Sequence, residues 1–191
     1  MLRTFSFTAQ PREAHPDEAL VAAAQAEPAA FEALYARYFP RVYRYLAARA
    51  ETTEDAADLA QAVFERAFVA IGRYRPGKTP FASWLFRIAR NAAIDAHRQR
   101  RPSVPWELLP AFEPAAGESP EHGALRTERV RELRRAIATL NNEKRDLLAL
   151  RYAGGLTVPE IAPLVGKNPE AVKKQLQRTL QQIKEHYRDD E

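Results

Sequence analysis

A basic segment between Arg73 and Arg101 carries the side chains of this sequence that are best suited to binding a polyanion. It holds eight arginine and lysine residues and a single acid, Asp95. Apolar residues recur every three or four positions, which predicts a helix with one buried face: Phe81, Trp84, Leu85, Ile88, Ala89 and Ala92. The pattern favours an exposed basic surface for nucleic acid, but a solvated face on an ordinary core helix would look the same.

A second pattern suited to DNA lies near the C-terminus, where two predicted helices flank a turn containing Gly166. Thr157 with Glu160 is a capping box for the first helix, and Asn168 suits the cap of the second. About three residues between the helices are typical of a helix-turn-helix, whose second helix enters the major groove. Its candidate DNA contacts lie off the apolar stripe: Glu170, Ala171, Lys173, Lys174, Gln177 and Arg178. Helical hairpins of bundles that never bind DNA share this pattern.

An acidic helix is predicted over residues 52–72. Acids in its first turn, Glu54 and Asp55, favour the helix dipole. Its expected buried stripe consists of Ala60, Val63, Phe64, Ala67, Phe68 and Ile71. Three further polar residues follow one exposed strip at three- and four-residue spacing: Asp58, Gln61 and Glu65. This strip is either solvated surface or a docking face for a basic partner.

Composition limits the class of protein. The chain has 191 residues, 46% of them hydrophobic, which suffices for packed cores, and its formal net charge is +4. It has no cysteine, which excludes disulfides, thiol catalysis and cysteine-based zinc sites. Strand signals are almost absent, and we find neither a long apolar run nor a signal-peptide pattern. We therefore expect an all-α protein of the cytoplasm.

Breaker residues divide the chain into four expected parts: a flexible tail at 1–16, a helical bundle at 17–101, a linker at 102–123 and a helix-turn-helix domain at 124–191. The linker has five prolines and no lysine or arginine. Within the bundle, Pro40 is expected to kink or break a helix. The predicted fold is thus all-α, with two small helical domains joined by an extended linker.

Catalysis is not indicated. The four histidines are scattered without metal-ligand spacing, and there is no glycine-rich phosphate loop or nucleophile elbow. We expect no catalytic residue, no metal and no cofactor. Two other classes fit the same elements: a stand-alone helix-turn-helix regulator whose bundle senses or dimerises, and a pure interaction module held by an inhibitor.

Taken together, these segments resemble the extracytoplasmic-function (ECF) sigma factors of the sigma-70 family. The family's promoter-melting helix is similar to FASWLFRIARNAAIDAHRQRR, its polymerase-docking helix to DAADLAQAVFERAF, and its promoter-binding helix-turn-helix to LTVPEIAPLVGKNPEAVKKQLQRTL. The resemblance covers residues 17–187. It implies a transcription initiation factor that binds core RNA polymerase, directs it to promoters through the −10 and −35 elements and helps to melt the DNA. The chain departs from the family's usual pattern at Lys174, Gln175 and Pro163. These departures bear on which −35 sequence the protein would read, and not on its class.

The resemblance also implies roles for individual residues. Contacts with the polymerase β′ clamp helices would come from Asp55, Asp58, Leu59, Gln61, Phe64 and Glu65. Contacts with the −10 element would come from Arg75, Lys78, Ser83, Arg87, Arg90, Asn91, Asp95 and Arg98. Contacts with the −35 element would come from Thr157, Asn168, Glu170, Ala171, Lys173, Lys174, Gln177 and Arg178. Further implied partners are the polymerase β flap and an anti-sigma factor, which could hold the protein at the membrane; no small-molecule substrate and no direct membrane insertion are expected.

Overall fold

The computed structural model describes residues 17–75, 79–99 and 130–189. In these residues every regular element is helical, which confirms the predicted all-α class. The expected tail at 1–16, the expected linker at 102–123 and the candidate DNA-binding residue Lys78 lie outside the described residues. The four domain boundaries stay predictions.

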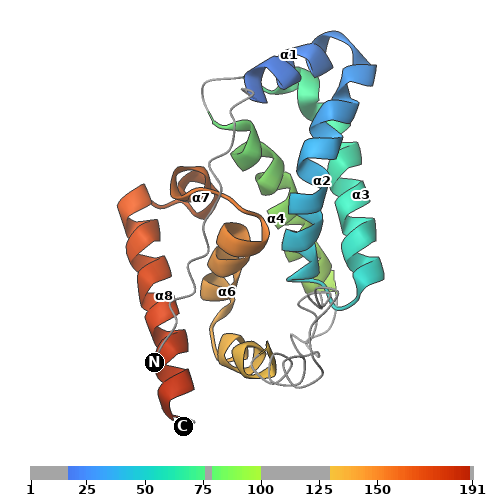
Figure 1. Ribbon diagram of the computed structural model, residues 1–191. Helices are drawn as coiled ribbons and strands as arrows, with labels where there is room; N and C mark the ends of the chain where they lie inside the picture. The colour runs from blue at the N-terminus through green and yellow to red at the C-terminus, as the bar shows by residue number, and fades with distance from the viewer. Residues whose placement is uncertain (1–16, 76–78, 100–129, 190–191) are drawn as a thin grey trace, which may run out of the picture.

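The N-terminal elements form a bundle around α2 (Figure 1). Helix α1 covers Asp17–Ala26, the 3-10 turn η1 covers Pro28–Ala30, and α2 covers Phe31–Ala47. Helix α3 covers Thr53–Ala70, the 3-10 turn η2 covers Ile71–Arg73, and α4 covers Phe81–Gln99. The side chain of Thr52 caps α3 by accepting a hydrogen bond from the backbone N–H of Asp55 at 3.0 Å.

Helix α2 is not broken at Pro40, contrary to one of the two outcomes expected from the sequence. Proline removes one helical hydrogen bond and costs about 3 kcal/mol in a helix interior. However, Tyr38 and Val42 on either side of it are fully buried in the same core. The packing of both halves of the helix therefore outweighs the local penalty.

The C-terminal elements contain the helix-turn-helix. Residues 130–138 are helical, and α6 (Asn142–Leu148) continues into the π-helical turn η3 (Ala149–Ala153). Helix α7 covers Val158–Val165 and α8 covers Pro169–Asp189. Gly166 lies in the left-handed region with φ of 66°, which a glycine adopts without strain, and it ends α7. The side chain of Asn168 accepts a hydrogen bond from the backbone N–H of Ala171 at 2.8 Å, so the predicted cap of α8 is confirmed.

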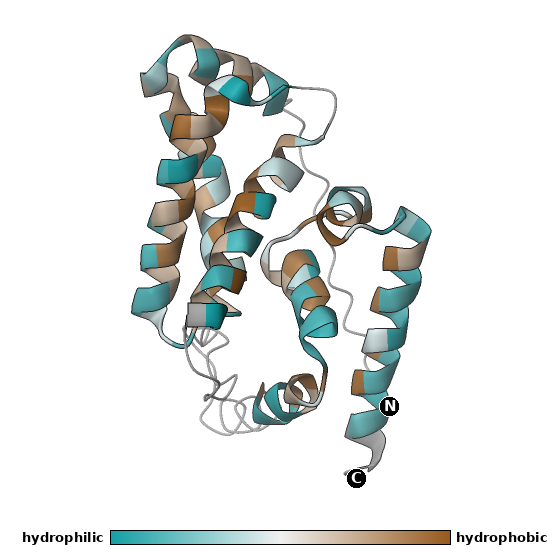
Figure 2. Cartoon of the chain, turned by 180° about the vertical axis from the view of Figure 1, so that it is seen from behind, coloured by the Kyte–Doolittle hydropathy of each residue, from teal (hydrophilic) through white to brown (hydrophobic). Residues whose placement is uncertain are grey.

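Helix α4 lies between the two groups of helices (Figure 1). It packs on α2 and α3 on one side and on α7 on the other, while η3 packs on α2. The hydrophobic faces of the helices turn toward one another, as Figure 2 shows, and the outer side of α8 is mostly hydrophilic. A single set of buried residues therefore connects both groups of helices.

Candidate nucleic-acid interface

The acidic strip of α3 is exposed, as the sequence predicted. The side chains of Asp58, Gln61 and Glu65 face solvent, and the Gln61 amide donates a hydrogen bond to Glu65 at 2.9 Å. The other proposed polymerase contacts on α3 are less accessible: Asp55 and Leu59 are half-buried, and Phe64 is buried. Phe64 packs edge-on against other aromatic rings of the bundle and supports the helix from inside.

An aromatic surface adjoins this strip. Phe68, which the sequence pattern placed in the buried stripe, is 46% exposed. Tyr35 is 41% exposed and stacks on Phe39 with ring centroids 5.0 Å apart. Both rings lie beside Phe31 or Phe64 at the edge of the core. The helical period alone cannot show which end of an apolar stripe is left uncovered by neighbouring helices, and so the sequence pattern missed this edge.

Four of the proposed −10 contacts form an exposed polar row on α4: Arg87, Asn91, Asp95 and Arg98. Their spacing of three or four residues places them on one side of the helix. Arg75, at the end of the segment before α4, is also exposed, and its guanidinium donates to the carbonyl of Gly72 at 3.0 Å. This part of the predicted basic surface is therefore open to solvent.

Two other proposed −10 residues point into the contact with the C-terminal helices. Ser83 is fully buried, and its hydroxyl donates to the backbone carbonyl of Glu160 at 2.8 Å. Arg90 donates from Nε to Oδ2 of Asp146 at 2.7 Å. A role for either residue in DNA binding stays a prediction, and it requires this contact to separate.

Asp146 is the centre of that contact and was missed by the sequence analysis. It is 4% exposed, and its Oδ1 accepts a hydrogen bond from the Tyr45 hydroxyl at 2.9 Å. The same oxygen lies 3.2 Å from Nη1 of Arg49. In the sequence Asp146 is only an acid among the leucines of α6. Its buried position could not be inferred, because its partners are between 56 and 101 residues away.

Burial and the neighbouring carboxylate shift the pKa values of Tyr45 and Arg90. Burial, and then the charge of Asp146, raise the pKa of Tyr45 far above its ordinary value. Burial lowers the pKa of Arg90, but its hydrogen bond and charge interaction with Asp146 outweigh that effect and raise it. The carboxylate is therefore surrounded by a protonated phenol and two guanidinium groups.

The buried cation Arg41 holds the end of η3. Its Nε donates to the carbonyl of Gly154 and its Nη2 to the carbonyl of Gly155, each at 2.9 Å. The guanidinium also lies over the ring of Tyr38, 5.0 Å from its centroid. The carbonyls at a helix end need such donors when they are buried, and here the donor comes from the N-terminal bundle.

Most of the proposed −35 contacts lie on the solvent-exposed side of α8. The exposed residues among the proposed contacts are Thr157, Asn168, Glu170, Lys173, Lys174, Gln177 and Arg178, whereas Ala171 is half-buried. Thr157 is the N-cap of α7, and its backbone N–H donates to the Glu160 carboxylate at 2.7 Å. The geometry of Thr157 is therefore that of a helix cap, and its contact with DNA stays a prediction.

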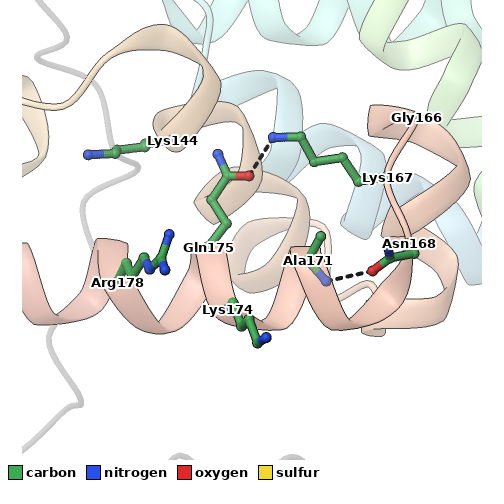
Figure 3. Close-up of a pocket in the computed structure, with 8 residues that line it drawn as sticks. All are labelled: Lys144, Gly166, Lys167, Asn168, Ala171, Lys174, Gln175 and Arg178. Atoms are coloured by element: carbon green, nitrogen blue, oxygen red, sulfur yellow. Dashed lines mark hydrogen bonds between the residues drawn. The ribbon is translucent and has the colours of Figure 1, made fainter.

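A pocket of about 730 Å³ adjoins the start of α8 (Figure 3). Four cations line it: Lys144, Lys167, Lys174 and Arg178. Lys167 donates to Gln175 at 2.6 Å and also to the Glu143 carboxylate. The hydrogen bond from Lys167 is the main cause that lowers the pKa of Glu143. A group of cations at this position suits a phosphate of the DNA backbone. Within the described ranges, no group of three or more His, Asp or Glu side chains is placed to hold a metal ion.

Two family models match separate parts of the chain. The family described as Sigma-70 region 2 matches residues 34–102, and the family described as Sigma-70, region 4 matches residues 130–183. The first match covers most of α2 and all of α3 and α4, and the second covers α7 and most of α8.

Several ECF RNA polymerase sigma factors are similar in sequence. BldN of Streptomyces coelicolor is 37% identical over 81% of this chain and 59% of its own length. SigD of Mycobacterium bovis is 35% identical, over 76% of this chain and 71% of its own length. The RNA polymerase sigma factor CarQ of Myxococcus xanthus is 34% identical, over 82% and 88%. The chain thus spans less than two thirds of BldN but most of CarQ.

Solved structures of similar fold include CnrH in complex with the cytosolic domain of CnrY. It has a TM-score of 0.64 and 26% sequence identity, over 92% of this chain and 99% of that one. The sigma factor RpoE in complex with the anti-sigma factor NepR from Bartonella quintana has a TM-score of 0.61 over 84% and 98%; at 19% identity this likeness concerns the fold alone. From the sequence relatives and the two region matches, the chain belongs to the ECF sigma factors of the sigma-70 family, which are non-enzymatic transcription initiation factors that act with RNA polymerase.

Proposed function

We propose that this chain binds core RNA polymerase, directs it to promoters through the −10 and −35 elements and helps to open the DNA. The observation that carries the proposal is the order of the two matches, region 2 over 34–102 and region 4 over 130–183. Each falls on helices with an exposed polar surface of the kind that its role requires. The division into a bundle at 17–101 and a helix-turn-helix domain at 124–191 is part of the proposal.

The proposed polymerase-docking surface is the exposed strip of α3. Asp58 and Glu65 supply negative charge for a basic partner, and the neighbouring edge with Tyr35 and Phe68 supplies apolar area. Interfaces of this composition combine aromatic anchors with a polar rim. We assign this surface to the β′ clamp helices.

The proposed −10 surface is the polar row of α4. Opening a promoter requires bases to leave the stack, which costs a few kcal/mol per base. Contacts of Arg87 and Arg98 with phosphates can offset part of that cost. Trp84 packs against Tyr74 and Phe81, with ring centroids 5.3 and 5.5 Å away, so it supports α4 from the core.

The proposed −35 surface is the open side of α8, which would enter the major groove. Lys174 and Arg178 can bind phosphates or guanine edges, and Gln177 can pair with adenine. Asn168 caps α8 by accepting from the backbone N–H of Ala171, so it fixes the start of the helix that would enter the major groove.

An anti-sigma factor is the proposed regulator. CnrH, the similar structure with 26% identity, is itself bound to the cytosolic domain of CnrY. Core polymerase and promoters are cytoplasmic, and we place the activity there. In the part of the chain that the structure describes, no helix combines the length and apolarity of a membrane span.

Run-off transcription with purified core polymerase tests the proposal. We expect discrete transcripts only when the chain and core polymerase are both present, and mapping their 5′ ends identifies the −10 and −35 sequences. Core polymerase alone is the control. Duplex DNA binding by the chain alone, with a Kd of about 10 nM in physiological salt and no transcript with polymerase, would instead indicate a stand-alone regulator.

A further inference from the structure

Helix α1 is joined by side-chain hydrogen bonds to residues 71–75, which come before α4 in the chain. Nε2 of Gln25 donates to the backbone carbonyl of Ile71 at 2.8 Å and to that of Tyr74 at 2.9 Å, which uses both hydrogens of the amide group. These carbonyls belong to η2 and to the residue that follows it. One side chain of α1 therefore holds the end of the helical run that α3 begins, 46 to 49 residues away in the sequence.

Helix α1 is itself fixed on the bundle. Its first residue, Asp17, accepts a hydrogen bond from the Tyr38 hydroxyl at 2.6 Å, and its Oδ1 lies 3.2 Å from Nε of Arg37; both partners belong to α2. Val21 of α1 is fully buried in the core. The helix lies across one end of the bundle and packs on α2, η2 and α4 (Figure 1). It therefore provides a rigid support for Gln25.

Tyr74 extends this support to the start of α4. Its hydroxyl donates to the backbone carbonyl of Thr79 at 2.7 Å, and its ring packs edge-on against Phe81, with centroids 5.6 Å apart. Burial is the main cause that raises the pKa of Tyr74, so the hydroxyl stays protonated and able to donate at neutral pH. A residue whose carbonyl is held by Gln25 thus also sets where α4 begins.

Arg75, an exposed residue of the proposed −10 set, takes part in the same group of bonds. Its Nη1 donates to the carbonyl of Gly72 at 3.0 Å and to that of Tyr74 at 3.2 Å. The carbonyl of Tyr74 therefore accepts from both Gln25 and Arg75. A guanidinium whose direction is already set loses less conformational freedom on binding. Supporting residues of this kind determine how precisely a binding group meets its partner.

We propose that Gln25 is a positioning residue for the −10 surface: by holding the carbonyls of Ile71 and Tyr74, it fixes Arg75 and the start of α4 in the geometry that reads the −10 element. The inference rests on the proposed role of Arg75 and α4 in promoter binding. It gives a role to α1, which lies before the region 2 match that begins at residue 34. No contact between Gln25 and DNA is required.

Hydrogen exchange of the free chain, measured by NMR, tests whether Gln25 holds residues 71–75. Gln25→Met keeps the neutral charge and about the same side-chain length but removes both donor hydrogens. The backbone N–H of Tyr74, which donates to Ile71 at 3.0 Å, should then exchange roughly fivefold or more faster, because two neighbouring hydrogen bonds are lost. The matched control is Ala22→Met, at an exposed residue one turn earlier on the same side of α1, and it should exchange like the parent.

Promoter selectivity separates positioning from stability. With the polymerase complex, initiation is measured on a mapped promoter and on derivatives with one changed base pair in the −10 or the −35 element. A changed base pair typically weakens specific binding by roughly fivefold to 150-fold, and Gln25→Met should lower the −10 ratio by about threefold or more while the −35 ratio stays within about twofold of the parent. A chain that is only destabilised would lose activity in proportion on every promoter, so neither ratio would change.

Gln25→Glu is a second variant of nearly the same shape, with a carboxylate that cannot donate at neutral pH and that would face two carbonyl oxygens. It should speed exchange and lower the −10 ratio at least as much as Gln25→Met. Its control is Ala22→Glu, which adds the same charge to the same side of α1 and should keep the parent −10 ratio. Circular dichroism verifies the helices; if Gln25→Glu unfolds, Gln25→Met decides. Equal losses in Gln25→Glu and Ala22→Glu, with parent selectivity in Gln25→Met, would assign the effect to charge and overturn the proposal.

The two measurements distinguish failure of this inference from failure of the proposed function. Faster exchange at Tyr74 with an unchanged −10 ratio would refute the positioning role, and so would parent-like exchange in both Gln25 variants. A parent chain that yields no transcript with core polymerase would instead refute the proposed function. Exchange on the free chain would then decide by itself whether Gln25 holds residues 71–75.

Discussion

A Cβ atom on Gly154 would lie 2.6 Å from Cε1 of Phe86, closer than real side chains approach one another. Gly154 follows η3, and Phe86 is a fully buried residue of α4. The absence of a side chain at this position therefore sets how closely the C-terminal helices approach α4. Gly154 itself has an ordinary backbone conformation with φ of −74°, so the requirement comes from packing.

Gly154→Ala should lower the free energy of unfolding by roughly 1–3 kcal/mol, because the new methyl group overpacks a dense contact. Urea unfolding measures the change. Gly72→Ala is the control, since a Cβ atom on Gly72 would meet nothing within 4 Å, and it should change stability by less than about 0.5 kcal/mol. Equal stability of the two variants would show that Phe86 can move aside.

Tyr45 should make the chain sensitive to alkaline pH. Its pKa is raised in the folded state, so above about pH 10 the unfolded chain releases this proton while the folded chain retains it. Its contribution to stability is complete below the unfolded pKa and is lost as pH rises toward the folded pKa. The decline approaches about 1.4 kcal/mol per pH unit for one proton.

Tyr45→Phe should remove that part of the pH dependence and cost about 1 kcal/mol at neutral pH through the lost hydrogen bond to Asp146. Urea unfolding at about pH 8 and about pH 11 checks both effects. Tyr35→Phe, at a residue that is 41% exposed, is the matched control. The same alkaline decline in Tyr45→Phe and Tyr35→Phe would contradict the prediction.

Arg87→Ala and Arg90→Ala should separate DNA binding from stability. Both should reduce promoter opening by the polymerase complex, as measured by permanganate footprinting. Only Arg90→Ala should also lower the free energy of unfolding, by about 1–3 kcal/mol, because it removes a partner of buried Asp146. Normal opening with both changes would exclude α4 as the melting helix.

Asp58→Lys should reduce affinity for core polymerase about tenfold or more, because it places a cation opposite a basic partner. A pull-down of core polymerase measures binding, and circular dichroism verifies the fold. Glu27→Lys makes the same charge change at an exposed residue between α1 and η1 and should bind normally. Retained binding by Asp58→Lys would argue against docking through α3.

Arg178→Ala should weaken binding of the polymerase complex to its mapped promoters and lower the salt dependence. Loss of one phosphate contact reduces the slope of log K against log salt by about 0.9. Lys184→Ala, an exposed cation farther along α8, is the control. If both variants show the parent slope, Arg178 does not contact phosphate.

The sequence by itself determined the helices, their caps and the class of the protein. Asn168 and the pair Thr157 and Glu160 mark helix starts through hydrogen bonds that span three residues, and such local bonds can be inferred from spacing. The polar row of α4 and the acidic strip of α3 follow from the helical period in the same way. The continuity of α2 through Pro40 could not be inferred from the sequence, because it depends on the packing of residues on both sides of the proline.

Only the tertiary structure decided which polar residues are accessible. The family resemblance assigned Ser83 and Arg90 to the −10 surface, but their partners, Glu160 and Asp146, are 77 and 56 residues away. A one-dimensional pattern distinguishes the buried face of a helix from the rest, yet it cannot show that a second group of helices covers the polar face. That pairing depends on three-dimensional geometry, and here it joins the two halves of the chain through one buried carboxylate.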